Sequence, residues 1–564
     1  MLIIDRLVPL SLLLYHQYLN NLQSVSCSNF NHSEPIQCCG MLLQKSIPYL
    51  RRCRNISVSI RNHREVPGIS NQNVISKRLP LSVPLPMENK KVSTPKGALS
   101  IGRNSKLTQL SNGLKVCTEN TYGDFVTVGV AVDSGCRFEN GFPFGISRVV
   151  EKLAYNCSEN FRNRDDVYAQ LEENSGIVDC QSTRDTMMYA ASCHVDGTDS
   201  IISVLSDTVL RPIVDENSLE QAKLTVSYEN KDLPNRIEAI EILLTDYIHQ
   251  AAFQHNTIGY PKFGLDSLDK IRVSDVYGFL SRVHTPDRMV VGGIGVDHDE
   301  FVSIISRHFE SKQPIWNSQP NLLPAKIPQI DESRSQYTGG EVRIQKDLLS
   351  LTVGKPYPML AHVVLGLEGC SYKDEDFVAF CVLQSLLGGG GAFSAGGPGK
   401  GMYARMYTEL MNRHHYIYSA IAHNHSYSDS GVFTLTASTP PENINDALIL
   451  LVQQVLQLQH GVEMSELARA RTQLRSHLMM NLEVRPVLFE DMVRQVLGHG
   501  VRKHPEEYAE RIEKVSNVDI VRVAERLLSS KPSLVGYGDL TKLGDYISLD
   551  QALAKRDLKY LFKR

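Results

Sequence analysis

Val126-Thr-Val-Gly-Val-Ala-Val-Asp-Ser-Gly-Cys136 is the stretch that decides the fold, because a second stretch repeats it about 234 positions later. The repeat reads Ala361-His-Val-Val-Leu-Gly-Leu-Glu-Gly-Cys370. Both stretches are apolar strand candidates that end in an acidic residue, a glycine turn and a cysteine. Two copies of one strand-and-turn unit in a chain of 564 residues indicate two related halves.

Other parts of the chain support this duplication. Pro286-Asp-Arg-Met-Val-Val-Gly-Gly-Ile-Gly295 is echoed by Pro532-Ser-Leu-Val-Gly-Tyr-Gly538 about 245 positions on. A proline-rich stretch between the halves carries the single tryptophan, Trp316, and is typical of an ordered linker. The expected organisation is a leader over residues 1–95, a first domain over 100–310, a linker over 311–345 and a second domain over 346–564.

Each half mixes helix and strand patterns. Apolar periodicity predicts a helix over 444–458, and serine N-caps predict two more, from Ser465 towards Leu482 and from Ser218 through Glu229. Residues 416–422 and 432–437 have the composition of strands. The sequence therefore predicts an α+β sandwich in each half.

The composition excludes several classes of protein. No stretch approaches the roughly 20 consecutive apolar residues that a membrane span needs. The 11 cysteines are odd in number and form no CxxC pair, which argues against a disulfide framework or a cysteine zinc site. Nine basic and three acidic residues lie in positions 1–78, which leaves a net charge of −9 on the rest of the chain. This acidic balance argues against nucleic acid as a partner and favours basic ligands.

The leader is rich in serine, asparagine and arginine, poor in acidic residues and without a sustained apolar period. That composition is typical of a mitochondrial transit region, with cleavage expected between about residues 30 and 100. Two alternatives stay open. One is a secretory signal built on Leu7-Val-Pro-Leu-Ser-Leu-Leu-Leu14, which no clean cleavage site follows. The other is a surface tail without a targeting role.

The segment Gly145-Ile-Ser-Arg148-Val-Val-Glu151-Lys152-Leu-Ala has the frame of the helix of an inverted zinc peptidase. In that helix, His-x-x-Glu-His places two imidazoles on one face to hold zinc, and the glutamate deprotonates the bound water. Here Arg148 and Lys152 occupy the two ligand positions, and neither cation can bind zinc. Two carboxylates remain, Glu151 and the downstream Glu229, and an ion pair of Glu151 with Arg148 is the favoured interpretation. The sequence predicts no catalytic residue, no metal and no cofactor in this chain.

Residues 388–401 contain eight glycines in fourteen positions. A phosphate-binding P-loop would need glycine at position 394 and serine or threonine at position 401, where this chain has Ser394 and Gly401. A plain flexible linker is the alternative, but long loops inside a compact domain are usually functional, and glycines open their backbone groups to an extended peptide. The candidate substrate-binding residues are Gly388, Gly389, Gly390, Gly391, Phe393, Gly396, Gly397, Gly399, Lys400 and Gly401.

This loop, with Leu410-Met-Asn-Arg-His-His415 and Met479-Met-Asn-Leu-Glu-Val-Arg-Pro486 after it, resembles the alpha-type subunits of the mitochondrial processing peptidases, which belong to the inverted-zincin, pitrilysin-like M16 family. The degenerate helix, Thr285-Pro-Asp-Arg-Met289 and Gly538-Asp-Leu540 fit the same family. The resemblance covers nearly all of the chain from about residue 100 and implies two homologous pitrilysin-like (M16/LuxS-like metallohydrolase) α/β sandwich domains in tandem. One departure is Arg148, where these subunits commonly keep a histidine.

The resemblance also implies partners and a compartment. It implies a heterodimer in which a related beta subunit of the processing peptidase carries zinc and cleaves, while this chain binds the basic presequences of imported precursors. It places the pair in the mitochondrial matrix and leaves association with the inner membrane open. Two rivals stay open: a structural core subunit of the cytochrome bc1 complex, which the full glycine loop argues against, and an autonomous metalloprotease, which the missing histidines oppose. The acidic cluster Asp374-Glu-Asp376 is a candidate for pairing with presequence arginines, against a solvated surface turn.

Overall fold

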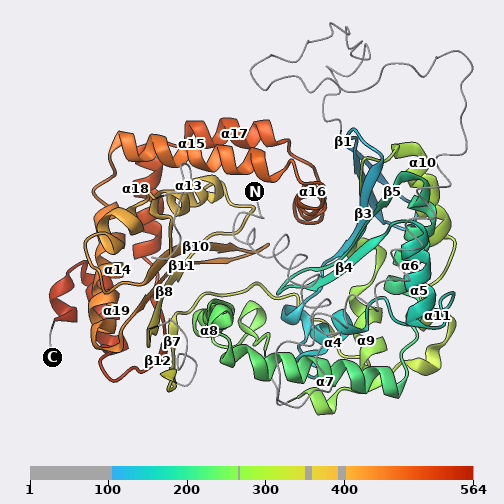
Figure 1. Ribbon diagram of the computed structural model, residues 1–564, viewed down its shortest axis with the longest axis horizontal. Helices are drawn as coiled ribbons and strands as arrows, with labels where there is room; N and C mark the ends of the chain where they lie inside the picture. Colours follow the sequence, from blue (N-terminus) through green and yellow to red (C-terminus); the bar gives the residue numbers. More distant parts are fainter. Residues whose placement is uncertain (1–104, 264–266, 350–357, 392–401, 563–564) are drawn as a thin grey trace, which may run out of the picture. The chain divides into compact units, whose positions relative to one another are not determined.

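The computed structural model describes residues 105–263, 267–349, 358–391 and 402–562. The expected leader lies outside these residues, and the domain boundaries stay predictions. The described chain forms two six-stranded sheets, in the orders β1-β2-β6-β3-β5-β4 and β7-β12-β8-β11-β10-β9 (Figure 1). The strands are β1 (Ser105–Gln109), β2 (Lys115–Glu119), β3 (Phe125–Val132), β4 (Ile177–Ser182), β5 (Met187–His194), β6 (Met289–Ile294), β7 (Gly340–Gln345), β8 (Ala361–Glu368), β9 (Gly389–Gly391), β10 (Ser419–Ser426), β11 (Gly431–Thr439) and β12 (Ser533–Gly538).

Helices follow the strands in both halves, so the α+β prediction is confirmed. They are α4 (Ile146–Leu153), α5 (Arg164–Glu173), α6 (Thr198–Leu210), α7 (Glu216–Asp232), α8 (Ile240–Phe253), α9 (Val273–Val283), α10 (His298–Ile305), α11 (Ile315–Ser318), α13 (Phe377–Leu387), α14 (Ile444–Leu458), α15 (Met464–Asn481), α16 (Arg485–His499), α17 (Pro505–Lys514), α18 (Asn517–Leu528) and α19 (Tyr546–Lys555). Short 3-10 and π helices join them. No helix among the described residues is long and apolar enough to cross a membrane.

The two stretches that repeat each other form equivalent central strands. The first gives β3 and the second gives β8, and each lies between two antiparallel neighbours. The helix predicted over 444–458 is confirmed as α14. Two predicted N-caps were wrong by two or three residues. Helix α15 begins after Glu463 rather than at Ser465, and α7 begins after Asp215, whose carboxylate accepts the N–H of Ser218 in a capping box.

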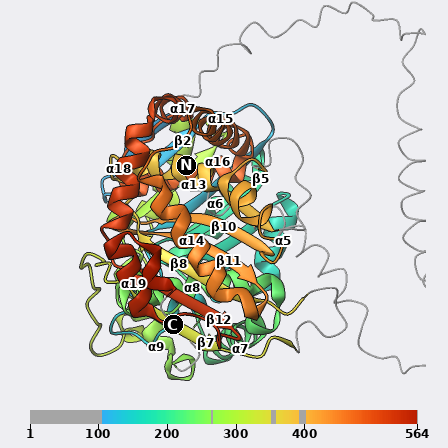
Figure 2. The ribbon, with the colours of Figure 1, turned by 90° about the vertical axis from the view of Figure 1, so that its left-hand side faces the viewer.

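One face of each sheet is covered by helices from the same half of the chain. Val126, Val128 and Val130 of β3 are buried in one apolar cluster with residues of α4, α6 and α10. The corresponding face of the second sheet packs against α13, α14 and α18, which lie in front of β8, β10 and β11 in Figure 2. Successive side chains of a strand point to opposite faces of its sheet, so the other face of each sheet also needs a covering element.

The second face of each sheet is covered by a helix from the other half. Helix α16 packs on β3 and β6 of the first sheet, and α8 packs on β7, β8 and β12 of the second. Apolar residues of α8 form a buried cluster with side chains of the second sheet that includes Ile248, Val364 and Val535. Each half thus completes the core of its counterpart.

Two adjacent glycines let α16 approach the first sheet. Gly129 of β3 and Gly292 of β6 are register partners on neighbouring strands. A Cβ atom at Gly292 would lie 2.3 Å from Cγ1 of Val493, and one at Gly129 would lie 2.7 Å from Cζ of Phe489. The two glycines therefore leave a hollow in the sheet that Phe489 and Val493 fill, and any side chain at either position would close it.

Polar contacts hold α8, which packs on the sheet of the other half, and also link the two halves directly. Arg184, on the turn between β4 and β5, forms a buried ion pair with Asp246 of α8 and donates to the carbonyl oxygens of Ile258 and Tyr260 at 2.7 and 2.8 Å. Between the halves, Arg137 binds Asp429 in a bidentate ion pair at 2.8 and 2.6 Å. Burial alone would raise the pKa of Asp429, but its hydrogen bonds with Arg137 and Ser335 hold that pKa below its usual value.

We expect Gly292→Ala to lower the free energy of unfolding by about 1–3 kcal/mol, the usual cost of overpacking, because the new methyl group meets Val493. Adding Val493→Ala should recover part of that loss by removing the opposing methyl groups. Urea unfolding of both single variants and the double variant measures the coupling. Strictly additive losses would contradict the contact.

Asp429→Asn should remove about 3 kcal/mol of stability at pH 7, because it leaves Arg137 buried without its carboxylate. The pKa of Asp429 is lowered in the folded chain, so its contribution is complete above the unfolded pKa of about 4 and disappears as the pH falls through the folded value. Urea unfolding between pH 7 and pH 3 should show the stability difference between wild type and variant shrinking. A difference that stays constant over this range would rule out the ion pair as its cause.

Candidate functional site

A buried carboxylate fixes the start of α4, the helix that carries the degenerate zinc motif. Glu139 accepts the backbone N–H groups of Gly145 at 2.7 Å and Ser147 at 3.0 Å. Burial raises the pKa of Glu139 to about 7, although these hydrogen bonds act in the opposite direction. Gly145 has a φ of 93°, which favours glycine, and so turns the chain into the helix. The motif therefore sits on a helix whose first turn is held in place.

The four residues of the degenerate motif form one ion-pair cluster. Arg148 binds Glu151 at 3.1 Å and Glu229 of α7 at 2.6 Å. Lys152 binds the same two carboxylates, at 3.4 and 2.8 Å. Each carboxylate thus pairs with both cations, and the cluster has no net charge. The sequence-based prediction that Glu151 pairs with Arg148 agrees with this geometry, and the structure adds Lys152 and Glu229 to it.

Residues far away in sequence complete the cluster. The backbone N–H of Ser182, at the end of the edge strand β4, donates to Glu151 at 3.0 Å. Lys262 donates to the carbonyl oxygen of Ser182 at 2.7 Å, and the guanidinium of Arg148 lies 5.6 Å from the ring centroid of Phe263. Sequence reasoning missed these contributors, because no spacing relates them to α4. Together they hold the cations against α7 and the sheet.

Zinc does not fit these residues. The two positions that would carry imidazoles hold a guanidinium and an ammonium, which offer no lone pair at neutral pH. The two carboxylates already bind those cations. Among the described ranges, no group of three or more His, Cys, Asp or Glu side chains could hold a metal ion. The cluster is consequently built to link α4, α7 and β4 rather than to activate water.

The predicted glycine-rich loop begins at the edge of the second sheet. Gly389, Gly390 and Gly391 form β9, which pairs with β10. A Cβ atom at Gly389 would lie 1.9 Å from the carbonyl oxygen of Ala420, so this strand requires glycine. The backbone carbonyl of Gly388 accepts the N–H of Ala422 at 3.0 Å. The other candidates lie outside the described residues: Phe393, Gly396, Gly397, Gly399, Lys400 and Gly401.

The acidic cluster 374–376 is tied to a helix of its own half. Asp374 binds Arg526 at 2.8 Å, and Asp376 binds Arg522 at 2.6 Å, both basic residues lying on α18. Glu375 is exposed. Two of the three carboxylates therefore already have intramolecular cations, which weakens their candidacy for binding a peptide arginine.

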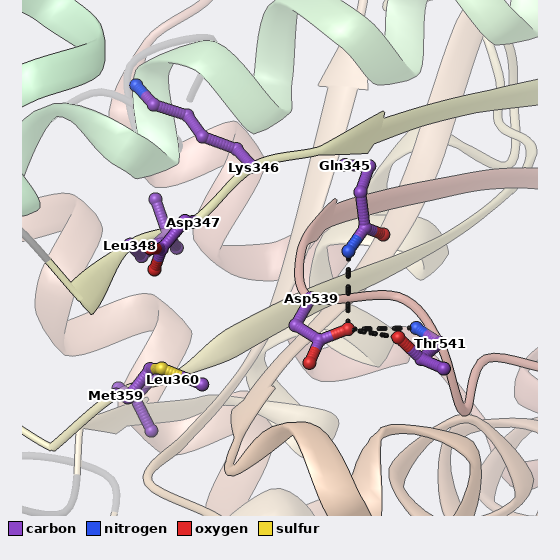
Figure 3. A pocket seen from close by; sticks show the side chains of 8 residues that line it. All are labelled: Gln345, Lys346, Asp347, Leu348, Met359, Leu360, Asp539 and Thr541. Carbon is purple, nitrogen blue, oxygen red and sulfur yellow. Dashed lines mark hydrogen bonds between the residues drawn. The ribbon is translucent and has the colours of Figure 1, made fainter.

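A small pocket lies where β7 ends and β8 begins (Figure 3). Its volume is about 230 Å³. Asp539 accepts hydrogen bonds from Gln345 at 3.3 Å and from the N–H of Thr541 at 3.1 Å, as the dashed lines show. None of the candidate site residues that the structure describes lines this pocket.

Glu151→Gln should lower the free energy of unfolding by about 1–3 kcal/mol, because it leaves Arg148 and Lys152 with one carboxylate instead of two. Glu220→Gln is a matched control, since Glu220 forms a more exposed i,i+3 pair with Lys223 and should cost less than about 1 kcal/mol. Chemical denaturation followed by circular dichroism measures both. Equal effects of the two variants would show that the cluster is not a structural link.

Comparisons with known proteins agree with this geometry. A model described as the insulinase family of M16 peptidases matches residues 115–264, and one described as the peptidase M16 inactive domain matches residues 270–474. A solved protease from Helicobacter pylori shares the fold, with a TM-score of 0.63 at 18% identity over 77% of this chain and 99% of that one.

Curated relatives are more similar still. The mitochondrial-processing peptidase subunit alpha of Caenorhabditis elegans is 79% identical over 93% of this chain and 100% of its own length. The human protein of the same name is 40% identical over 85% of this chain and 90% of its own length. With two pitrilysin-like α/β sandwich halves in tandem and an M16 helix whose ligand positions are cationic, the chain belongs to the family of mitochondrial-processing peptidase alpha subunits, within the M16 peptidases.

Proposed function

We propose that this chain is the noncatalytic, substrate-recognising subunit of a mitochondrial processing peptidase, and that a beta subunit supplies zinc and cleaves the presequence. The observation that carries this proposal is the two-by-two ion cluster of Arg148, Lys152, Glu151 and Glu229. A chain whose own motif is neutralised in this way can serve peptide hydrolysis only by binding substrate or partner. The names of the relatives point to the same enzyme.

Substrate binding is assigned to the glycine-rich loop, residues 388–401. Its first part forms β9, the edge strand of the second sheet, and an extended peptide is commonly bound at a sheet edge through backbone hydrogen bonds. The net charge of −9 after residue 78 attracts basic presequences over a long range. The proposed compartment is the mitochondrial matrix, which the basic leader and the relatives' names support.

Reconstitution tests whether the beta subunit supplies zinc and cleavage while this chain does not. The purified chain, a beta subunit and a fluorescent presequence peptide are assayed separately and together, with metal analysis of each protein. We expect zinc in the beta subunit, less than 0.1 equivalent in this chain, and cleavage only in the mixture. One tightly held zinc in this chain, or cleavage by this chain alone, would overturn the proposal.

Affinity purification from mitochondria separates the proposal from its rival. Recovery of a zinc-bearing M16 partner supports the processing peptidase. Recovery of cytochromes in stoichiometric amounts would favour a structural core subunit of the cytochrome bc1 complex instead. The N-terminal sequence of the purified chain shows in the same experiment whether the leader has been removed.

Deleting residues 392–399 should weaken presequence binding by at least tenfold while leaving heterodimer assembly intact, because the glycine loop is assigned to the substrate. Lys400→Ala is the matched control and should be mild, since a basic side chain contributes no attraction for a basic peptide. Fluorescence anisotropy measures the binding, and gel filtration the assembly. A loop-deleted heterodimer with normal affinity and turnover would remove the loop from substrate recognition.

A further inference from the structure

Five large apolar side chains are exposed around one end of the first sheet. Phe125 begins β3, and Tyr122 lies in the loop before it. Ile177 begins β4, Val195 follows β5, and Val484 precedes α16. Their exposed fractions are 88% for Tyr122, 61% for Ile177, 53% for Phe125 and Val484, and 42% for Val195. A folded protein surface seldom exposes so many large apolar residues in one place without a binding role.

Backbone pairing, a ring contact and hydrogen bonds join these residues into one surface, here called the β3–α16 patch. Phe125 and His194 are register partners, and their ring centroids lie 5.9 Å apart. The N–H of Val195 donates to the carbonyl oxygen of Asp124 at 2.9 Å. Arg485, the first residue of α16, donates to the carbonyl oxygens of Tyr122 and Phe125 and so brings Val484 to the same end of the sheet.

Ile177 lies on the same face of the sheet as Phe125. Ser192 is the register partner of both Ile177 and Thr127, and alternate residues of a strand share a face. This face is the one that α16 covers further along, where Gly129 meets Phe489. The patch is therefore the part of that face that α16 leaves exposed.

Acidic residues border the patch. Asp124 lies between Tyr122 and Phe125, Asp196 follows Val195, and Glu483 precedes Val484, and all three are exposed. The guanidinium of Arg485 is bound to two backbone carbonyl groups, and the imidazole of His194 lies 3.3 Å from Asp196. The surface thus combines an apolar centre with an anionic rim.

We propose that the β3–α16 patch is a docking surface for the presequence, receiving its apolar side chains on Phe125, Ile177 and Val484 and its basic side chains on the acidic rim. The occupant is a basic amphipathic peptide, because its apolar face matches the apolar centre and its basic side chains match the three acids. This surface on the first sheet, in addition to β9 at the edge of the second, lets the chain hold a long presequence at two places. This inference rests on the proposed function.

Two variants of the intact heterodimer test it. Ile177→Ser/Val484→Ser removes apolar contact, and Asp124→Asn/Glu483→Gln removes charge. Both change exposed residues and should leave folding intact. We expect each to raise the Kd for a fluorescent presequence peptide by at least fivefold, with the charge variant also showing a weaker dependence on salt. A peptide of the same charge with its apolar residues scattered should bind both wild type and the apolar variant equally weakly.

Matched controls use exposed residues on other surfaces. Val518→Ser/Ile547→Ser is the apolar control, and Glu238→Gln/Glu525→Gln is the charge control. Neither should change the Kd by more than about twofold. If the patch variants bind the peptide as these controls do, the docking surface is wrong, while normal binding by the wild type still supports the proposed function. A wild-type heterodimer that binds no presequence would contradict both.

A photo-crosslinker attached at position 484 of the heterodimer identifies what covers the patch. An adduct with the labelled presequence, competed away by unlabelled peptide, is the expected result. An adduct with the beta subunit, or loss of heterodimer assembly in the Ile177→Ser/Val484→Ser variant, would assign the patch to the subunit interface and overturn the proposal.

Discussion

The contact between α16 and the glycine hollow of the first sheet is the constraint on which the rest of the structure depends. Gly129 and Gly292 leave space that Phe489 and Val493 fill, so a helix from the second half closes the core of the first. Helix α8 does the same for the second sheet. Because each sheet has one face that its own half leaves uncovered, neither half can bury all its apolar surface alone. The two halves therefore form one folding unit from residue 105 onward.

The packing of α8 on the second sheet is also connected to the candidate site. Arg184 ties α8 to the turn after β4, and β4 carries the Ser182 N–H that binds Glu151. In a zinc site the two carboxylates would face one divalent cation, whereas here the same positive charge is divided between a guanidinium and an ammonium. Two separate cations can each form directional hydrogen bonds, which suits a structural link. They leave no open position for water, which a catalytic metal requires.

The sequence predicted the parts of the structure that depend on local pattern. The repeated strand motif located β3 and β8, and helical spacing located α14 and the Arg148–Glu151 pair. The cap of α7 was misplaced, since Asp215 and Ser218 compete for the same role and only the geometry decides between them. The cap of α15 was misplaced because that helix begins after Glu463, a residue type that cap preferences do not favour. The packing of α16 on the first sheet could not be predicted, because Gly129 and Gly292 are required only by their contacts with Phe489 and Val493, about 200 or more positions away. The same holds for Lys262 and Phe263 at the ion cluster.

The ion cluster also makes zinc binding at α4 hard to reach by single substitutions. Histidine at position 148 alone would leave Lys152 to neutralise both Glu151 and Glu229, and histidine at position 152 alone would leave that task to Arg148. Neither intermediate has the two imidazoles that zinc needs, yet each loses one cation from a partly buried network, at a cost of about 1–3 kcal/mol. Any route to metal binding by single substitutions would therefore pass through a less stable intermediate.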